Sequence, residues 1–212
     1  MADAGDGRRG VRLTERQRLA WLRLIRSDNV GPATFRDLIN HFGSAERAIE
    51  HLPELSRRGG ARADIRIATE AEAERELETA EKFGAVFIGI GEPEYPSALR
   101  MIDGAPPLLA ATGDLSITAK PSVGMVGSHN ASISGMKFAG RIAHEVGAAG
   151  YSIVSGLARG IDAAAHQASI ETGTIAAFAG GLDQPYPPEN LELYARIRDG
   201  AGLAISEMPM GW

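Results

Sequence analysis

Loops rich in glycine and hydroxyl side chains recur in the second half of the chain, each after a short apolar segment. A segment at residues 123–126 leads into Gly127 and Ser128, and a second segment leads into Ser155 and Gly156. Glycine lets the backbone approach a ligand closely, and N–H groups at the start of a following helix attract anions. The pattern favours phosphate binding, although a plain tight turn explains the first loop alone equally well.

The loop that begins at Ser155 carries the most side-chain chemistry. Arg159 offers a permanent positive charge whose planar fork fits a phosphate. Asp162 and His166 stand four residues apart, so they share one face of the helix that follows. An acid–base couple is one interpretation, but no serine occupies a Gly-x-Ser-x-Gly elbow, and Asp162 is typical of a helix cap. We therefore predict that Asp162 and His166 hydrogen-bond to each other and steady the loop.

A third loop, residues 180–190, contains prolines on both sides of Tyr186. This ring can stack on a nucleic-acid base, a contact of roughly 1–3 kcal/mol per base. Packing of the ring beneath its flanking prolines is the alternative. The five histidines lack the spacing of metal ligands, and the chain has no cysteine. The sequence therefore predicts no catalytic residue, no metal site, no cofactor and no disulfide.

Composition narrows the class of protein further. The chain has 212 residues, of which 44% are hydrophobic and 23% charged, as in ordinary globular proteins. Residues 1–10 lack the apolar core of a signal peptide, and the longest weakly polar run, 174–182, is too short to cross a bilayer. We expect a cytoplasmic protein with no membrane contact.

The charge balance argues against a broad basic surface. The net charge is −5, and residues 117–212 hold six Lys and Arg against eight Asp and Glu. Many DNA-binding domains have a basic face, so any grip on phosphate must be local here.

From Pro121 onward, short apolar strands alternate with helices. Strands are expected at 123–126, 151–154, 174–178 and 203–205, with helices at 134–149, from 161 to 170, and at 191–198. This alternation predicts a parallel sheet with helices on both faces, and ligands of such sheets lie beyond the carboxyl ends of the strands. The three loops follow successive strands at that edge.

The first quarter of the chain predicts a small helical module after a disordered tail at 1–12. Helices are expected from Thr14, after Gly31, and from Ser44 to Ile49, with Gly43 ending the second one. The pair around Gly31 resembles a helix-hairpin-helix unit, although a protein–protein module is the alternative because only one glycine is present. A basic linker at 52–63, an acidic helix at 69–83 and a strand at 85–90 follow. We divide the chain into a helical (helix-hairpin-helix/SAM-like) module at 1–64 and an α/β domain at 65–212.

Several sequence blocks together resemble the DNA-processing protein A family, also called DprA or Smf. The resemblance covers residues 14–212, and its most specific block runs from Ser155-Gly156-Leu157-Ala158 through Gly160-Ile161-Asp162 to Ala165-His166. Other matching blocks are Tyr95-Pro96, Pro106-Pro107, Val126-Gly127-Ser128, Tyr186-Pro187 and Ser206-Glu207.

The resemblance implies a Rossmann-like, often dimeric, non-enzymatic protein that binds single-stranded DNA. Such proteins protect incoming DNA during natural transformation and help to load the RecA recombinase. By similarity the first two loops hold successive phosphates, Tyr186 is a candidate for base stacking, and Asp162 and His166 support the loops. The implied phosphate-binding residues are Gly127, Ser128, His129, Ser155, Gly156, Arg159 and Gly160.

Two departures from the family pattern affect these expectations. The family has arginine directly after the Gly-Ser pair, where this chain has His129. Histidine is largely uncharged near pH 7, so a weaker, pH-dependent grip is expected. The chain also ends at Trp212, where family members continue with further strands. We expect a C-terminally truncated piece that lacks part of the sheet and the dimer face.

Two other functions remain open at this point. Related Rossmann-like enzymes cleave nucleoside monophosphates with a Pro-Gly-Gly-x-Gly-Thr run, but this chain has Ala179-Gly180-Gly181-Leu182-Asp183, without the threonine or the paired acids. An interaction adaptor acting through the helical module is compatible with DNA binding.

Overall fold

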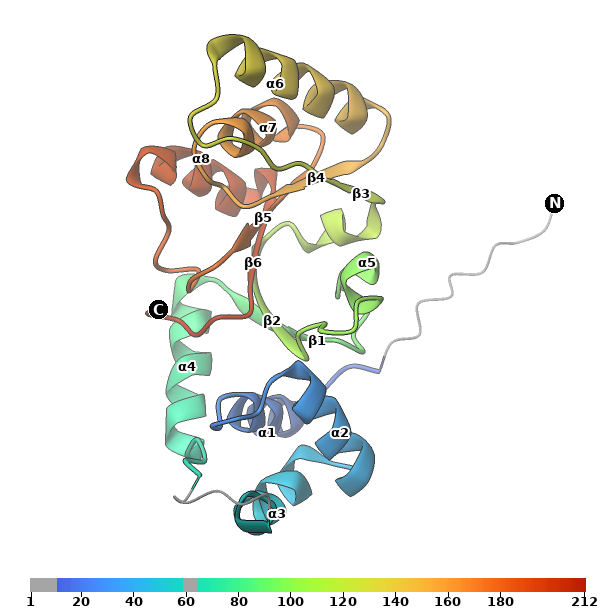
Figure 1. Cartoon of the computed structure of the whole chain (residues 1–212), viewed down its shortest axis with the longest axis vertical. Coiled ribbons are helices and arrows are strands. Elements are labelled where there is room, and N and C mark those ends of the chain that lie inside the picture. The colour runs from blue at the N-terminus through green and yellow to red at the C-terminus, as the bar shows by residue number, and fades with distance from the viewer. Residues whose placement is uncertain (1–10, 59–64) are drawn as a thin grey trace, which may run out of the picture.

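The computed structural model describes residues 11–58 and 65–212. It places three N-terminal helices at one end of a six-stranded sheet that carries the remaining helices (Figure 1). Most of the tail expected at 1–12, and the last part of the expected linker, lie outside the described residues.

The N-terminal module consists of α1 (Glu15–Ile25), α2 (Pro32–Phe42) and α3 (Ala45–Arg58). Thr14 caps α1 through a reciprocal pair of hydrogen bonds with Gln17, and Gly43 ends α2 at a φ of 80°. Trp21 and Phe35 join α1 to α2, with their ring centroids 5.0 Å apart. The helices predicted from Thr14 and after Gly31 are confirmed.

The third helix is longer than expected. The prediction that it stops at Ile49, with an irregular linker from Leu52, is wrong, because α3 continues through Pro53 to Arg58. Proline costs a helix one backbone hydrogen bond. Leu52, one residue earlier, is buried in the core shared by the three helices, and that burial offsets the loss.

A long acidic helix links this module to the sheet. Thr69 and Glu72 cap the start of α4 (Glu70–Phe83), and Gly84 ends it at a φ of 85°. The chain then forms β1 (Val86–Gly89), α5 (Ser97–Arg100), β2 (Leu108–Gly113) and the 3-10 turn η1 (Leu115–Ala119).

The rest of the chain alternates strands with helices, as predicted. The elements are β3 (Ser122–Gly124), α6 (Ile133–Ala148), β4 (Ser152–Ser155), α7 (Ile161–Ser169), β5 (Thr174–Phe178), η2 (Pro188–Asn190), α8 (Leu191–Arg196), η3 (Ile197–Ala201) and β6 (Leu203–Ser206).

The strands form one sheet in the order β1-β2-β6-β5-β4-β3. Strands β3 to β6 are parallel, which is the Rossmann-like arrangement that was expected. Strand β2 pairs antiparallel with β6, and β1 pairs antiparallel with β2. The sheet is therefore mixed, with an antiparallel pair added beside the parallel half.

Helices lie on both faces of the sheet, but unequally. From β3 to β6, each new strand is added next to the previous one and always in the same direction across the sheet. Because the connections between such strands are right-handed, α6, α7 and α8 all lie on one face. Helix α4 packs on that face too, against a core that includes Phe87, Ala110 and Ala176. The other face is covered by the segment around Tyr95 and by Ile117 of η1. Figure 1 shows α4 and α8 on one side and α5 on the other.

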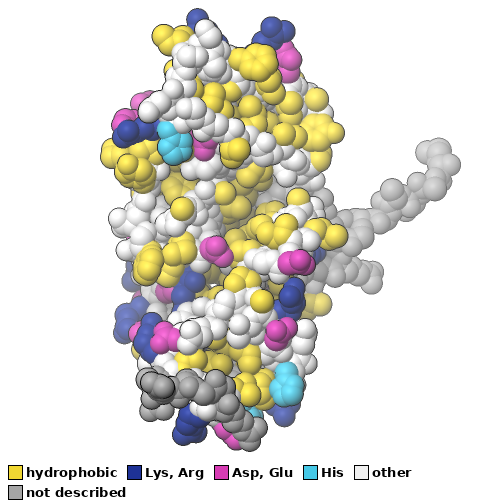
Figure 2. Space-filling view, viewed as in Figure 1, with side chains coloured by type: hydrophobic (Ala, Val, Ile, Leu, Met, Phe, Trp, Pro, Cys, Tyr) yellow, Lys and Arg dark blue, Asp and Glu magenta, His cyan; other side chains and the backbone are white. Residues whose placement is uncertain are grey.

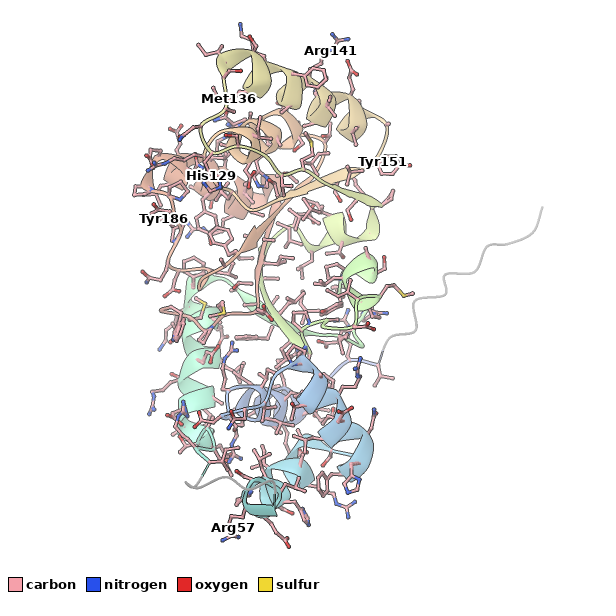
Figure 3. All side chains as sticks on the ribbon, in the orientation of Figure 1. Arg57, His129, Met136, Arg141, Tyr151 and Tyr186 are labelled. Atoms are coloured by element: carbon pink, nitrogen blue, oxygen red, sulfur yellow. The ribbon has the colours of Figure 1, made fainter. Side chains whose placement is uncertain are left out.

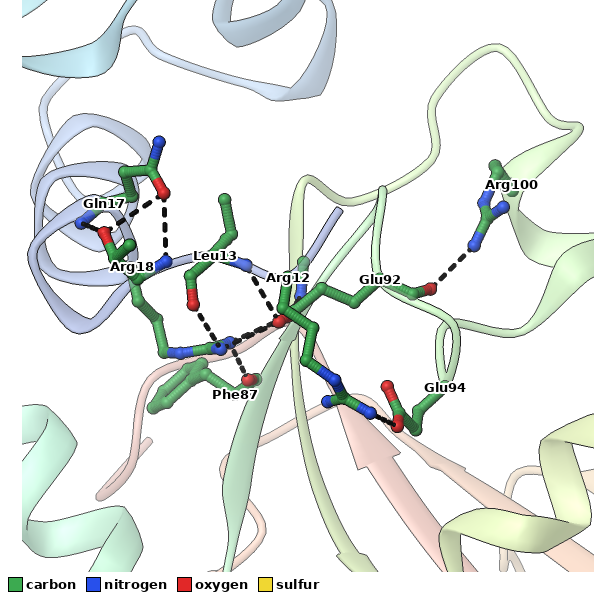
Figure 4. A network of polar contacts seen from close by, with 10 residues as sticks. Arg12, Leu13, Gln17, Arg18, Phe87, Glu92, Glu94 and Arg100 are labelled. Atoms are coloured by element: carbon green, nitrogen blue, oxygen red, sulfur yellow. Dashed lines mark hydrogen bonds and ion pairs between the residues drawn. The ribbon is translucent and has the colours of Figure 1, made fainter. Parts of the chain in front are cut away.

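Polar contacts fasten the helical module to the edge of the sheet (Figure 4). Arg18 of α1 pairs with the buried carboxylate of Glu92 at 2.8 Å and also donates to the carbonyl of Phe87 in β1. Arg26 pairs with Glu76 of α4, also at 2.8 Å. The module is thus bonded to both β1 and α4. Among the helices of the described residues, none has the length and apolar character needed to cross a membrane.

Candidate functional site

The loops that follow β3 and β4 touch each other at the carboxyl edge of the sheet. Gly160 has a φ of 73°, and a Cβ added there would lie 2.3 Å from the carbonyl oxygen of Ser128. A Cβ added at Gly127 would lie 2.6 Å from the side chain of Ile161. Both positions therefore require glycine because two backbones and a side chain meet there.

The loop after β5 completes a groove of about 420 Å³. Its lining residues come from all three loops: His129, Asn130, Gly156, Ala158, Arg159, Phe178, Ala179, Gly180, Gln184, Tyr186 and Pro187. Figure 3 shows His129 and Tyr186 on the same side of the α/β unit. The three successive strand ends therefore contribute to one groove, and that this groove is the binding site remains a prediction.

The first loop is open to solvent. Gly127, Ser128 and His129 are all exposed, and the Ser128 hydroxyl accepts the N–H of Asn130 at 3.2 Å. Ser132 then caps α6 by accepting the N–H of Gly135. An exposed loop before a 16-residue helix presents the positive end of the helix dipole to an approaching anion.

The second loop has already used part of its hydrogen-bonding capacity. The buried Ser155 hydroxyl donates to the carbonyl of Met125 at 2.7 Å. The N–H groups of Gly156 and Ala158 point to one carboxylate oxygen of Asp162, at 3.1 and 3.4 Å. Gly156 thus lines the groove while the buried Ser155 does not, and the donors of both residues are engaged within the protein.

The predicted hydrogen bond between Asp162 and His166 does not form. Asp162 faces the loop amides instead, while Nδ1 of His166 lies 2.7 Å from the hydroxyl of Thr174. Nε2 of His166 is buried without a hydrogen-bond partner among the described residues. Burial lowers the pKa of His166 to about 4, against the opposing attraction of the Asp162 carboxylate. The imidazole is therefore neutral near pH 7.

Arg159 reaches the groove, but its charge is already paired. Its Nη2 atom lies 2.6 Å from Oε1 of Glu189, and the two side chains are 51% and 57% exposed. Glu189 belongs to η2, in the last part of the third loop. Sequence reasoning missed this partner, because nothing in the spacing of the two residues links them.

Tyr186 is 72% exposed. The alternative in which the ring packs beneath its flanking prolines is therefore wrong. An exposed aromatic ring at the rim of the groove is available for stacking.

Asn190 is a second residue that the sequence did not single out. Its buried Nδ2 donates to the carbonyls of Leu157 and Ala158, at 2.8 and 3.1 Å. Leu157 has a φ of 56°, which is uncommon for a branched side chain. Asn190 therefore holds the second loop in an unusual conformation. The available signal was an asparagine directly before α8, but that position is also typical of an ordinary helix cap.

Among the described residues, no group of three or more His, Asp and Glu side chains is arranged to hold a metal ion. A Rossmann-like α/β unit with glycine-rich loops at its strand ends, preceded by a helical module, defines the class of protein, and ligands of such units lie beyond the carboxyl ends of the parallel strands.

Comparison with known proteins identifies the family within that class. The family model for DNA recombination-mediator protein A matches residues 86–212, and the model for the DprA-like N-terminal HHH domain matches residues 15–79. The chain therefore belongs to the DNA recombination-mediator protein A family, as the sequence blocks predicted.

Individual relatives agree with this assignment. Protein Smf of Synechocystis is 32% identical over 203 residues, which are 90% of this chain and 51% of that protein. DNA processing protein DprA of Bacillus subtilis is 39% identical over 113 residues, or 52% of this chain and 38% of its own. The chain thus spans about half the length of the curated relatives it matches, or less.

Solved structures show the same fold. The X-ray structure of DNA processing protein A from Streptococcus pneumoniae matches with a TM-score of 0.61 and 29% identity, over 86% of this chain and 58% of that one. DNA processing protein A from Helicobacter pylori, whose structure is described in terms of a single-stranded DNA binding mode, matches with a TM-score of 0.52 and 25% identity. That match covers 58% of this chain and 55% of the other.

Proposed function

We propose that this chain binds single-stranded DNA along the groove at the carboxyl ends of β3, β4 and β5. The observation that carries the proposal is the meeting of three loops, which places a cation, Arg159, and an exposed ring, Tyr186, on one groove. A strand with unpaired bases offers both phosphates and free π-faces, whereas the bases of a duplex are already stacked. The single-strand binding mode described for the Helicobacter pylori relative supports the assignment.

The residues divide into two roles. Gly127, Ser128, His129, Arg159 and Gly160 form the phosphate-binding surface, and Tyr186 stacks on a base. Ser155 and Gly156 shape the second loop, supported by Asp162 and His166.

The whole protein is proposed to act as a homodimer in the cytoplasm, protecting incoming DNA during natural transformation and loading the RecA recombinase. Support for this part comes from family membership alone. Co-sedimentation of RecA filaments with the protein on oligonucleotides tests it, and equal filament formation with and without the protein would count against it.

An enzymatic role at the groove is not favoured. The Ser155 hydroxyl donates to the carbonyl of Met125, and the buried His166 bonds to Thr174 rather than to the Ser155 hydroxyl, so the two form no activated nucleophile. Incubation with nucleoside monophosphates, followed by detection of free base, tests this; release of base by the wild type but not by Arg159→Ala would reverse the assignment.

Fluorescence anisotropy with labelled oligo-dT strands and a matched duplex tests DNA binding directly. The wild type should prefer the single strand, and Arg159→Ala should weaken that binding about fivefold, roughly 1 kcal/mol for one charged contact that first has to leave Glu189. Arg141→Ala is the matched control, because Arg141 also sits in an exposed ion pair, with Glu145 on α6. Equal affinities of the two variants, or no preference for single strands, would refute the proposal.

A further inference from the structure

The ion pair between Arg159 and Glu189 joins two segments that are also hydrogen-bonded to each other. Glu189 precedes Asn190, whose side chain is hydrogen-bonded to the carbonyls of Leu157 and Ala158. Those two residues directly precede Arg159 in the chain. The backbones that carry the two charges are therefore fixed side by side, which lowers the entropic cost that makes most surface ion pairs weak.

Two carboxylates lie near the second loop, those of Asp162 and Glu189, and they differ in how easily they can give up their present partners. Asp162 is 6% exposed and accepts two backbone N–H groups, so it is a permanent part of the loop. Glu189 is more than half exposed and makes a single ion pair. Only Glu189 can move into water without leaving buried donors unsatisfied.

Arg159 is also the one permanent positive charge among the described residues that line the groove. Whichever anion holds its guanidinium group therefore decides how strongly the groove attracts a phosphate. We propose that Glu189 is a built-in competitor for the DNA phosphate: it holds Arg159 until an incoming phosphate displaces it. This inference rests on the proposed function.

Displacement makes the contact at Arg159 an exchange of one anion for another. The strand gains the guanidinium contact, but the protein loses the pair with Glu189 and brings a phosphate close to a released carboxylate. A polyanion that contacts only Arg159 therefore binds weakly. Tight binding depends on further contacts, such as stacking of a base on Tyr186.

The test compares Glu189→Gln and Glu189→Ala with Glu192→Gln, an exposed glutamate on α8 whose replacement changes the net charge equally. Affinity for labelled oligo-dT is measured by anisotropy across a salt series. Both Glu189 variants should bind about two- to fivefold more tightly than the wild type, since an exposed pair is of that strength. The gain should shrink as salt rises, because screening weakens the pair and the repulsion together.

A double-mutant cycle separates competition from a general charge effect. In the Arg159→Ala background, Glu189→Gln should improve binding no more than Glu192→Gln does, because the group it competes for is gone. Weaker binding by Glu189→Gln would mean that Glu189 positions Arg159 for DNA. That result would overturn the inference about Glu189 and leave the proposed function standing. A gain equal to that of Glu192→Gln in the wild-type background would do the same. Absence of single-strand binding in the wild type and in every variant would instead refute the proposed function.

Discussion

Exposure divides the polar side chains around the groove into two sets. Ser155, Asp162 and His166 are buried, and each hydrogen-bonds inside the protein. His129 and Tyr186 are exposed. Substitution in the buried set should change the stability of the fold, while substitution in the exposed set should change binding and leave the fold intact.

Tyr186 gives the clearest case of the second kind. Replacing it with alanine should weaken binding of oligo-dT by about 1–3 kcal/mol, because one base loses its stacking partner. Tyr186→Phe keeps the aromatic face and should bind almost as well as the wild type. Both variants should unfold at the wild-type denaturant concentration. Comparable losses in the alanine and phenylalanine variants would argue against stacking.

His166 gives the clearest case of the first kind. Its pKa is lowered by burial to about 4, so the folded state binds fewer protons than the unfolded state between pH 4 and pH 6.5. The contribution of the neutral imidazole to stability is complete above pH 6.5 and is lost as the pH falls. Between pH 7 and pH 5 the loss should be about 2 kcal/mol.

Urea unfolding of the wild type and of His166→Gln at both pH values measures this loss. Glutamine does not titrate, so the free energy of unfolding of the variant should fall by about 2 kcal/mol less over the same interval. Parallel decreases in the two proteins would show that His166 is not responsible.

The positions of the three loops that line the groove could be predicted from the sequence, but the ion pair between two of those loops could not. Glycine and hydroxyl residues after apolar segments mark strand ends by local rules, and those rules found all three loops. Glu189 lies 30 residues beyond Arg159 in the chain, and the two meet only because η2 folds back onto the second loop. Such a tertiary contact leaves no periodic signal in a single sequence.

At the scale of elements, the difference between local sequence patterns and tertiary contacts also explains which strands and helices could be predicted. Strands β3 to β6 alternate with helices and were predicted, whereas β2 was missed. The side chains of β2 are buried at five successive positions from Leu108, so it lacks the alternation that marks a half-buried strand. Strand β6 is equally buried, but it could be predicted because it ends the series in which strands alternate with helices, and β2 lies outside that series. The end of α3 was misplaced because Pro53 predicts a break that the burial of Leu52 overrides.

The contact between α1 and the sheet depends on one buried carboxylate. Glu92 is 2% exposed and accepts from Arg18 and from the N–H groups of Gly89 and Leu13. Burial by itself would raise the pKa of Glu92, but these hydrogen bonds outweigh it and the pKa lies below its usual value. Glu92 therefore stays ionised, and it needs its partner.

Replacing Arg18 with methionine should destabilise the protein by about 3 kcal/mol, because the charge on Glu92 remains buried without its cation. Arg16→Met is the matched control: Arg16 is largely exposed, 3.8 Å from Glu46, and its loss should cost less than about 0.5 kcal/mol. The double variant Arg18→Met/Glu92→Gln should recover part of the loss, because glutamine removes the buried charge and keeps an oxygen that can accept a backbone N–H group. Chemical denaturation measures all three, and a small effect of Arg18→Met would show that the module docks mainly through its apolar contacts.

At the scale of the whole molecule, the charge distribution restricts how DNA can be held. The chain carries 22 Lys and Arg against 27 Asp and Glu. On the face shown in Figure 2, basic side chains are scattered among acidic ones rather than gathered into a patch. Binding at the groove must therefore come from few phosphates, with backbone groups and stacking supplying the rest.

This restriction predicts an unusually shallow salt dependence. For single strands, the logarithm of the binding constant falls with the logarithm of salt concentration with a slope of about −0.7 per phosphate neutralised. With Arg159 and His129 as the basic side chains lining the groove, the slope should lie between about −0.7 and −1.5. Arg159→Ala should make the slope shallower by about 0.7, the share of one phosphate contact, while Lys137→Ala on α6 should leave it unchanged. A slope steeper than about −3 would require phosphate contacts well outside the groove, and the DNA would then follow a different surface from the carboxyl edge of β3 to β5.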